Sequence, residues 1–320
     1  METSLITGVA GQDGSYLAEQ LLARGDRVLG TVRPGQAASV LPVSIRDRIT
    51  LLEWDLADVG GMSYLLAGHR PQSLYHFAAL SSGAGMFDQP VLMGDCNGVA
   101  VARLLNSVAQ ASPATRFCLA ASSEMFGNAT SSPQSEASGF RPRSPYGAAK
   151  LFAHVAVANA RDRLGLFACS AILYNHESPR RSLAFVTRKI SDGVARIKLG
   201  LARELALGNL SARRDWGYAP DYVRAMSLML QQPSPADFVV ATGEDHSVRD
   251  FCEIAFGHVG LDYREFVRSA DEDFRPAERV PLVGDASLAF RSLCWEPEVA
   301  FDRLVRCMVD ADLRRLQSQT

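Results

Sequence analysis

Short apolar runs alternate with longer amphipathic runs along the first half of this chain. The short runs predict β-strands at Ser4–Thr7, Arg27–Val32, Ile49–Glu53, Leu74–Phe77, Arg116–Ala120 and Phe167–Leu173. The longer runs predict helices at Ser15–Arg24, Val91–Ala111 and Tyr146–Leu164. Strands that alternate with helices indicate βαβ units and a parallel sheet, whose ligands bind at the carboxyl ends of the strands.

The alternation loosens after about residue 174. Helices are expected at Phe185–Leu199, Asp221–Leu230 and Val248–Val259, with short strand-like pieces such as Asp237–Val240 between them. The sequence therefore predicts an α/β protein with a Rossmann-type, doubly wound parallel sheet and a smaller mixed α/β cap. Residues 1–173 would form the sheet domain, to which later segments return, and residues 174–320 would form mainly the cap.

Composition and charge narrow the classes of protein. The 320 residues carry a formal net charge of -2, which argues against a nucleic-acid binder because such proteins need a basic surface. No apolar run approaches the ~20 residues that cross a bilayer, and the first residues lack the basic start of a signal peptide. We therefore expect a cytoplasmic protein with no membrane partner. The six scattered cysteines predict neither a metal site nor a disulfide framework.

A glycine-rich loop follows the first strand. It reads Gly8-Val9-Ala10-Gly11-Gln12-Asp13-Gly14 and leads into the first helix. Glycines permit a tight turn and let backbone amides approach a pyrophosphate, which a helix N-terminus also attracts. A bare turn is the alternative, but the strand before the loop and the helix after it favour dinucleotide binding.

Residues after the second and third strands bear on the choice of cofactor. The second strand ends at Arg33 with no acidic residue beside it in the sequence, and an arginine there suits the 2′-phosphate of NADP better than the free ribose of NAD. The alternative is a solvated loop arginine. Asp55 follows the third strand, where its carboxylate can reach the adenine amino group or cap the next helix.

A tyrosine and a lysine begin the helix after the fifth strand. Tyr146 and Lys150 form a Y-x-x-x-K pair, and a spacing of four residues places both on one helix face. A nearby ammonium stabilises a phenolate, so we expect the pKa of Tyr146 to be lowered toward that of a general base. Lys150 can also bind the nicotinamide ribose. A solvent-exposed pair is the alternative.

Two residues just past the fifth strand complete the candidate catalytic set. Ser122 can hydrogen-bond a substrate hydroxyl beside Tyr146. Glu124 would face the space above the nicotinamide, where a carboxylate can take the proton from a carbon next to a newly formed ketone. The alternative is that Glu124 binds only loop backbone or solvent.

Two longer strings are much more specific than a generic dinucleotide signature. They are Gly11-Gln12-Asp13-Gly14-Ser15-Tyr16 and Asn175-His176-Glu177-Ser178-Pro179-Arg180-Arg181. Further strings lie at 142–151, 185–190, 207–210, 213–217 and 241–244. In these strings, nearly end to end, the chain resembles the GDP-mannose 4,6-dehydratases, nucleotide-sugar enzymes of the extended short-chain dehydrogenase/reductase superfamily.

The resemblance implies a lyase that dehydrates GDP-mannose or a closely related GDP-hexose or GDP-heptose. Tyr146 would take the 4-hydroxyl proton while hydride leaves C4 for NADP. Glu124 would take the C5 proton and help the 6-hydroxyl to leave as water, and hydride would return to C6 to give a 4-keto-6-deoxy sugar. Ser122 stands where the family has threonine, so the hydroxyl is kept.

The resemblance also implies the binding residues. NADP would be bound, mainly by the sheet domain, through Gly8, Gly11, Gln12, Asp13, Gly14, Arg33, Asp55, Leu56, Phe77, Ala78, Ala79, Ser81, Lys150, His176 and Arg181. The GDP-sugar would be held, mainly by the cap, through Asn175, Val186, Lys189, Leu207, Gly208, Arg214, Arg275 and Glu278.

The chain departs from the family where it would face the sugar. Leu80 replaces an amide, Ser82 and Gly83 replace a larger pair, and Leu92 replaces a cofactor-contacting tyrosine. The identity of the GDP-sugar is therefore left open. The loop after Arg33 is shorter than usual, and because that loop helps build the family's tetramer contact, we expect a homodimer, with a tetramer as the alternative.

Other functions would use the same residues. A GDP-sugar epimerase would use Tyr146 and Lys150 without net loss of water, and a keto-sugar reductase would consume added NADPH. Glu124 favours elimination, although related enzymes that are not dehydratases carry an acid at this position. A catalytically silent Rossmann protein that senses NADP or scaffolds a partner is a further alternative, which the presence of both Tyr146 and Lys150 disfavours.

Overall fold

A seven-stranded parallel sheet forms the centre of the structure, a computed structural model that describes residues 1–80, 87, 89–269 and 280–319. Its strands are β1 (Thr3–Thr7), β2 (Arg27–Val32), β3 (Thr50–Glu53), β4 (Ser73–His76), β5 (Arg116–Ala120), β6 (Ala168–Leu173) and β11 (Phe238–Val240). They lie in the order β11-β6-β5-β4-β1-β2-β3, and all pairs are parallel. This doubly wound order confirms the predicted fold class.

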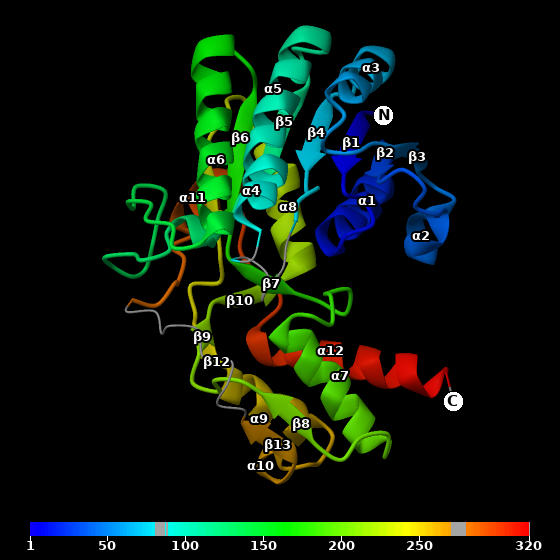
Figure 1. Cartoon of the computed structure of the whole chain (residues 1–320), viewed down its shortest axis with the longest axis vertical. Helices are drawn as coiled ribbons and strands as arrows, with labels where there is room; N and C mark the ends of the chain where they lie inside the picture. The colour runs from blue at the N-terminus through cyan, green and yellow to red at the C-terminus, as the bar shows by residue number, and fades with distance from the viewer. Residues whose placement is uncertain (81–86, 88, 270–279, 320) are drawn as a thin grey trace.

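Helices cover both faces of the sheet (Figure 1). The helices α3 (Val59–His69), α5 (Ala100–Ala111) and α6 (Pro145–Leu164) pack side by side on one face. On the other face lie α1 (Gln12–Arg24), α2 (Val43–Arg46), α8 (Ala219–Met229) and α11 (Ser287–Leu293). Because both faces are covered, the strands are apolar runs rather than alternating ones, and β6 is buried along its whole length.

The predicted helix over Val91–Ala111 is interrupted by one π-helical turn. It divides into α4 (Pro90–Gly94), the π turn η3 (Asp95–Val99) and α5. A side chain at Gly98 would meet the carbonyl oxygen of Ala149 at 3.3 Å, so the glycine lets α6 pack closely against the turn. Such a turn often marks a functional position, and here it carries Asn97 toward the end of β4.

The cap is built on a second hydrophobic cluster. Its helices are α7 (Val186–Lys198), α9 (Val248–His258), α10 (Tyr263–Phe266) and α12 (Phe301–Gln317). Three strand pairs accompany them, namely β7 (Asn175–Glu177) with β10 (Trp216–Tyr218), β8 (Leu205–Leu207) with β13 (Val267–Ser269), and β9 (Arg213–Arg214) with β12 (His246–Ser247). The pair β7–β10 lies between the sheet and the cap helices (Figure 1). The division between residues 173 and 174 stays a prediction.

Among the described residues, five helices have no counterpart in the predicted elements, namely α2, α3, α10, α11 and α12. Gly60, Gly61 and Gly68 weaken the helical pattern of α3. In α12 the buried face includes a charged residue, Asp312, which accepts a hydrogen bond from Arg188 at 2.6 Å. A buried ion pair interrupts the apolar period by which such helices are recognised. Two 3₁₀ turns, η1 (Ala38–Val40) and η4 (Ser123–Met125), complete the described elements.

Candidate active site

The glycine-rich loop lies where the strand order reverses, between the carboxyl ends of β1 and β4. Gly8 has a φ of +73°, and a Cβ on it would lie 2.9 Å from the amide nitrogen of Ala78 after β4. A Cβ on Gly14 would lie 2.5 Å from the carbonyl oxygen of Gly8. Both glycines are therefore required by close backbone approach. Ligands of doubly wound sheets bind in the crevice at this reversal.

The first turn of α1 is open to an anion. Its N-cap is Gly11, and no side chain caps the helix. The first backbone N–H groups of a helix have no intrahelical partner and point outward, where they attract phosphate. The loop and this turn therefore fit the pyrophosphate of a dinucleotide.

The two specific strings of the sequence bind one another. Asp13 Oδ2 lies 3.0 Å from Nε2 of His176, and Gln12 Nε2 donates to the His176 carbonyl oxygen at 3.1 Å. Ser178 Oγ donates to Gln12 Oε1 at 2.7 Å. Farther along, Arg180 donates to Glu19 at 2.5 Å. Gln12, Asp13 and His176, all predicted cofactor contacts, are thus brought together at the start of α1.

Arg181 lies beside this cluster. Its guanidinium is 3.6 Å from the ring centroid of Phe185, and its Nε lies 3.2 Å from Oε2 of the buried Glu177. Thr187 Oγ1 donates to the same carboxylate oxygen at 2.6 Å. The charge of Arg181 adds to the lowering of the Asp13 pKa and opposes the larger rise that burial causes in the pKa of Tyr146.

The structure brings Ser122, Glu124, Tyr146 and Lys150 together at the start of α6. Ser144 caps this helix by accepting from the Gly147 amide at 3.1 Å, with Pro145 in the first turn. A Cβ on Gly147 would lie 2.5 Å from the carbonyl oxygen of Glu124, so the glycine lets α6 pack against that residue.

The pKa of Tyr146 differs from the expectation. Burial of the phenol raises its pKa to about 12, and the Glu124 carboxylate adds to this, while a hydrogen bond with Ser122 opposes it. The ammonium of Lys150 lies 5.8 Å from the ring centroid, and it donates instead to the Ala120 carbonyl oxygen at 2.8 Å. Burial therefore decides the direction of the shift in the pKa of Tyr146.

Lys150 itself is buried, with 4% of its surface exposed. Burial lowers the pKa of its ammonium to about 8, and Asp13 opposes the shift. The Ala120 carbonyl is a weak partner for a full charge, so a ligand hydroxyl can compete for it. This is the arrangement expected of a lysine that binds a ribose in the loaded enzyme.

Glu124 carries a buried oxygen that has no partner. Its Oε2 makes no hydrogen bond within the described part of the chain. Its backbone amide donates to Ser122 Oγ at 3.2 Å, which holds the residue in the 3₁₀ turn after β5. A buried carboxylate oxygen without a donor is costly, and such groups in native proteins are often functional.

The candidate cofactor-selecting residues lie at the ends of β2 and β3. Arg33 is exposed. Glu53 Oε1 accepts from the Gly35 amide at 3.0 Å, so a carboxylate that sequence reasoning missed does lie beside the loop after Arg33. Asp55 accepts from the Ala57 amide at 2.9 Å, whereas Asp58 caps α3. Asp55 therefore does not cap that helix.

The segment after β4 is held by a residue that sequence reasoning also missed. The buried Asn97 accepts from the Leu80 amide at 2.8 Å and donates to the Leu80 carbonyl at 2.9 Å. Phe77, Ala78 and Ala79 lead up to this anchor and are partly buried. Leu80 thus contributes its backbone to a fixed turn. Ser81, Ser82 and Gly83 lie outside the described residues.

The predicted substrate contacts come from several elements of the cap. Asn175 begins β7, Val186 and Lys189 lie on the exposed side of α7, and Leu207, Gly208 and Arg214 lie on or beside β8 and β9. Leu207 is buried in the hydrophobic cluster of the cap, so its side chain supports the cap rather than faces a ligand. Leu56, a predicted cofactor contact, is partly buried after β3. Arg275 and Glu278 lie outside the described residues.

One residue of the strings that resemble the family, Asp215, stabilises the fold by accepting hydrogen bonds from backbone amides. The buried Asp215 accepts from the Thr242 amide and the Gly243 amide at 3.0 Å each, and from the Gly284 amide at 3.2 Å. It thereby ties the strings 213–217 and 241–244 to each other and to residue 284. Only the presence of Asp215 inside a family string could have pointed to it.

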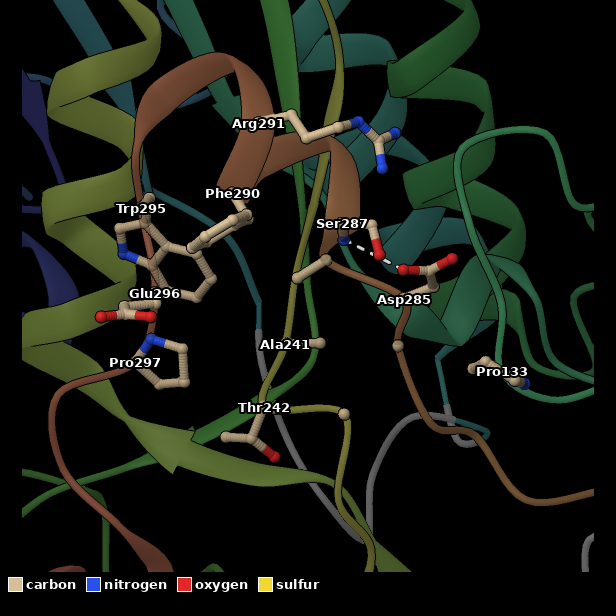
Figure 2. A pocket seen from close by; sticks show the side chains of 13 residues that line it. Pro133, Ala241, Thr242, Asp285, Ser287, Phe290, Arg291, Trp295, Glu296 and Pro297 are labelled. Atoms are coloured by element: carbon tan, nitrogen blue, oxygen red, sulfur yellow. Dashed lines mark hydrogen bonds between the residues drawn. The ribbon is translucent and has the colours of Figure 1, made fainter.

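A pocket of about 440 Å³ lies elsewhere, along β11 and α11. Figure 2 shows it between Phe290, Trp295 and Pro297 on one side and Ala241 and Thr242 on the other. None of the predicted site residues lines it. The pocket lies beyond the end of β11, which is four strands from β1, so at about 4.8 Å per step these two strands are roughly 19 Å apart.

Two kinds of feature are absent from the described residues. No group of three or more histidine, cysteine or carboxylate side chains among them could hold a metal ion. No helix within the same ranges is both long and apolar enough to cross a membrane.

Comparison with known proteins identifies relatives along the whole chain. The family model for GDP-mannose 4,6 dehydratase matches residues 5–308. GDP-mannose 4,6 dehydratase 2 of Arabidopsis thaliana is 45% identical over 97% of this chain and 86% of its own length. The GDP-mannose 4,6 dehydratase of Homo sapiens is 42% identical over 98% and 92%.

A solved structure supports the same placement. A putative epimerase from Burkholderia cenocepacia J2315 superposes with a TM-score of 0.85 at 26% identity, over 98% of each chain. The fold is therefore shared with an enzyme of a different name, whereas the sequence relatives and the family model agree with each other. On that agreement, the chain belongs to the GDP-mannose 4,6-dehydratase family.

Proposed function

We propose that this protein is an NADP-dependent lyase that converts GDP-mannose, or a closely related GDP-hexose or GDP-heptose, to a GDP-4-keto-6-deoxy sugar. The observation that carries the proposal is the buried Oε2 of Glu124 beside Tyr146, which has no hydrogen-bond partner among the residues that the structure describes. An epimerase needs one acid–base group at C4, but a dehydratase needs a second base for the C5 proton. Glu124 supplies that second group.

The residues of this chain divide the proton transfers between them. Tyr146 takes the 4-hydroxyl proton, with Ser122 placed to bond the same hydroxyl. A dinucleotide held by the glycine-rich loop would supply the hydride acceptor for C4 and the hydride donor for C6. Glu124 takes the C5 proton, which the neighbouring ketone has made acidic, and gives a proton to the departing 6-hydroxyl. One water is lost, and a proton returns to C5.

Burial favours the neutral phenol of Tyr146, so this phenol must release its own proton before it can act as a base. Its pKa of about 12 keeps it protonated at neutral pH, whereas the pKa of Lys150, about 8, leaves that ammonium largely charged. The Lys150 ammonium lies 5.8 Å from the centroid of the Tyr146 ring. If its hydrogen bond passed from the Ala120 carbonyl to a ribose hydroxyl, its charge would still lie near the phenol. Lys150 then favours the phenolate, which is the form of Tyr146 that can accept the 4-hydroxyl proton.

The loop and Arg33 support NADP as the cofactor. The amides of the first turn of α1 would hold the pyrophosphate, and the exposed guanidinium of Arg33 at the end of β2 suits a 2′-phosphate. Glu53, beside the same loop, is the observation that keeps NAD as the alternative.

An apolar face supports the expected homodimer. Val91 and Leu92 on α4 and Phe152 and Val155 on α6 are 43–76% exposed, and these two helices are neighbours. Large exposed apolar side chains gathered on adjacent helices are typical of an interface between copies of a chain. A tetramer remains the alternative state.

The proposal is tested by incubating the protein with GDP-mannose and a catalytic amount of NADP in heavy water. We expect mass spectrometry to show loss of one water and NMR to show deuterium at C5. An unchanged mass with a new sugar configuration would establish epimerisation instead, and stoichiometric consumption of added NADPH would establish a reductase. Turnover of a GDP-heptose but not of GDP-mannose would correct only the sugar.

A further inference from the structure

His176 has an oxygen acceptor at each of its ring nitrogens. Nδ1 lies 2.7 Å from the carbonyl oxygen of Tyr174, and Nε2 lies 3.0 Å from Oδ2 of Asp13. The residue is 8% exposed, and its ring stacks on Tyr222 with centroids 4.8 Å apart. No ring nitrogen is therefore left over for a ligand.

Two acceptors require two ring protons. A backbone carbonyl accepts only, and an ionised carboxylate accepts only, so both nitrogens of His176 must carry hydrogen. A neutral ring would turn a lone pair toward one of the two oxygens. Burial lowers the pKa of His176, but Asp13 outweighs it, so that pKa is raised overall. Burial raises the pKa of the Asp13 carboxyl, but the charge and hydrogen bond of His176 outweigh burial and hold that pKa below its ordinary value.

The groups that face the pair come from each neighbouring element. Arg181, after β7, opposes the charge of His176 and favours that of Asp13. Lys150, from α6, interacts with the charge of Asp13. Tyr222 from α8 stays neutral, because burial raises its pKa well above the ordinary value. Among the groups that act on the pair, the Asp13 carboxylate is therefore what keeps a buried imidazolium charged.

The pair joins the nucleotide loop to the segment after β6. Asp13 lies in the first turn of α1, and its Oδ1 also accepts from Gln12 Nε2 at 3.0 Å. Gln12 in turn bonds the His176 carbonyl and the Ser178 hydroxyl. Hence the orientation of the turn that presents amides to a pyrophosphate depends on residues 176 to 178.

We propose that His176 is a positioning residue, held as an imidazolium, that fixes the glycine-rich loop for dinucleotide binding through Asp13 rather than through contact of its ring nitrogens with the ligand. This deepens the proposed function and rests on it only in taking the loop as the dinucleotide site.

The sign of the pH dependence follows from the raised pKa. The charged pair is fully present below the ordinary histidine value of about 6.5 and is lost as the pH rises through the pKa of His176 in the folded protein. Dinucleotide affinity should therefore fall with rising pH. In Asp13→Asn the amide can donate a hydrogen bond to Nε2 of a neutral His176. The hydrogen bond between residues 13 and 176 is therefore kept, but it no longer depends on protonation of the histidine.

The test is calorimetric titration of the intact protein with NADP, and with NAD alongside, between pH 6 and about pH 9.5. We expect the wild-type dissociation constant to rise about tenfold or more, as loss of a charged hydrogen bond implies. Asp13→Asn should lose the part of this change that is due to His176 and keep only the part due to Lys150, whose ammonium has a pKa of about 8. Nitrogen NMR of the wild-type ring should show two protonated nitrogens at pH 7. Circular dichroism verifies that each variant is folded.

Asp310→Asn is the matched control. It alters a second histidine–carboxylate pair, His258 with Asp310 at 2.7 Å, which joins α9 to α12 in the cap. This variant should retain the wild-type pH profile. A neutral ring in the wild type, or an Asp13→Asn profile that follows the wild type, would overturn the inference. Failure to dehydrate GDP-mannose would instead overturn only the proposed function, because the titration uses no sugar.

Discussion

At the scale of single residues, Glu124 stands out because its buried Oε2 makes no hydrogen bond within the described part of the chain. An unpaired buried polar group costs about 1–3 kcal/mol, and the fold accepts this cost at Oε2 of Glu124. The backbone of the same residue is firmly held, through Ser122 and through the close approach of Gly147. The backbone of Glu124 is thus held in place, whereas its carboxylate oxygen makes no hydrogen bond among the described residues. A base that takes its proton from the substrate needs this combination.

Replacement of Glu124 by glutamine keeps the shape and removes the base. We expect Glu124→Gln to lower dehydration of GDP-mannose by about 100-fold or more, the usual share of a general acid–base group. C4 oxidation should persist, visible as transient absorbance of the reduced dinucleotide. Proton exchange at C5, followed by NMR in heavy water, should be lost.

Glu136→Gln is the control for that substitution. Glu136 is also partly buried, but its Oε1 accepts from the Val239 amide at 2.7 Å, away from the catalytic set. An amide oxygen can accept the same bond, so this variant should dehydrate normally. Normal C5 exchange in Glu124→Gln would remove Glu124 from the mechanism.

At the scale of elements, the site depends on how closely two helix N-termini approach strand ends. The start of α1 packs on the loop after β1 through Gly14, and the start of α6 packs on the turn after β5 through Gly147. Neither position leaves room for a methyl group. Each element thereby brings backbone amides or reactive side chains to the same edge of the sheet.

Gly14→Ala tests the first of these contacts. Its Cβ would lie 2.5 Å from the Gly8 carbonyl oxygen and 2.8 Å from the Val9 Cα, both backbone atoms that cannot turn away. We expect the free energy of unfolding to fall by about 1–3 kcal/mol, as for other overpacked sites. Dinucleotide binding, measured by calorimetry, should fall by at least about tenfold, since 1.4 kcal/mol corresponds to tenfold.

Gly68→Ala provides the comparison. Gly68 lies in α3, and a Cβ on it would meet nothing within 4 Å. Alanine there should raise the free energy of unfolding by about 0.5–1 kcal/mol and leave dinucleotide binding unchanged. Equal binding by Gly14→Ala and the wild type would show that the loop tolerates a wider approach than its geometry indicates.

At the scale of the whole molecule, the exposed apolar face of α4 and α6 lies just outside the catalytic edge. The same helix, α6, carries Tyr146 and Lys150 in its first turns and Phe152 and Val155 farther along. Association through this face would therefore stabilise the helix on which the reaction depends.

Light scattering after size-exclusion chromatography tests the expected association. The wild type should have the mass of a dimer, and the double variant Phe152→Glu, Val155→Glu should have the mass of a monomer, because four buried carboxylates would face each other across a twofold interface. Leu201→Glu changes a similarly exposed leucine beyond α7 and should remain dimeric. A monomeric wild type would contradict the expected dimer.

The sheet was largely predictable from the sequence. The predicted bounds of β2 and β5 coincide with the observed strands, because an apolar run buried on both faces needs no partner to be recognised. Helix α12 was not predicted, since Asp312 on its buried face is acceptable only when Arg188 of α7 is opposite. The pattern of apolar residues along one helix does not show which residue of another helix will pair with a charge on its buried face.

The sequence predicted which residues form the candidate site better than it predicted their protonation. Ser122, Glu124, Tyr146 and Lys150 do meet at one strand end. The pKa of Tyr146 was expected to fall, and it rises because burial, which the sequence does not state, outweighs a lysine directed at Ala120. Likewise the motif identified His176, but only the structure shows that both its nitrogens are already occupied.

The link between Asp13 and His176 also bears on the order in which the protein matures. The two residues are 163 positions apart, so the carboxylate in the nucleotide loop lacks its histidine partner until the chain has grown past β7. Contacts of such separation form late, because a long loop must close first. A dinucleotide that requires the completed loop would then bind only finished molecules and shift the folding equilibrium toward them.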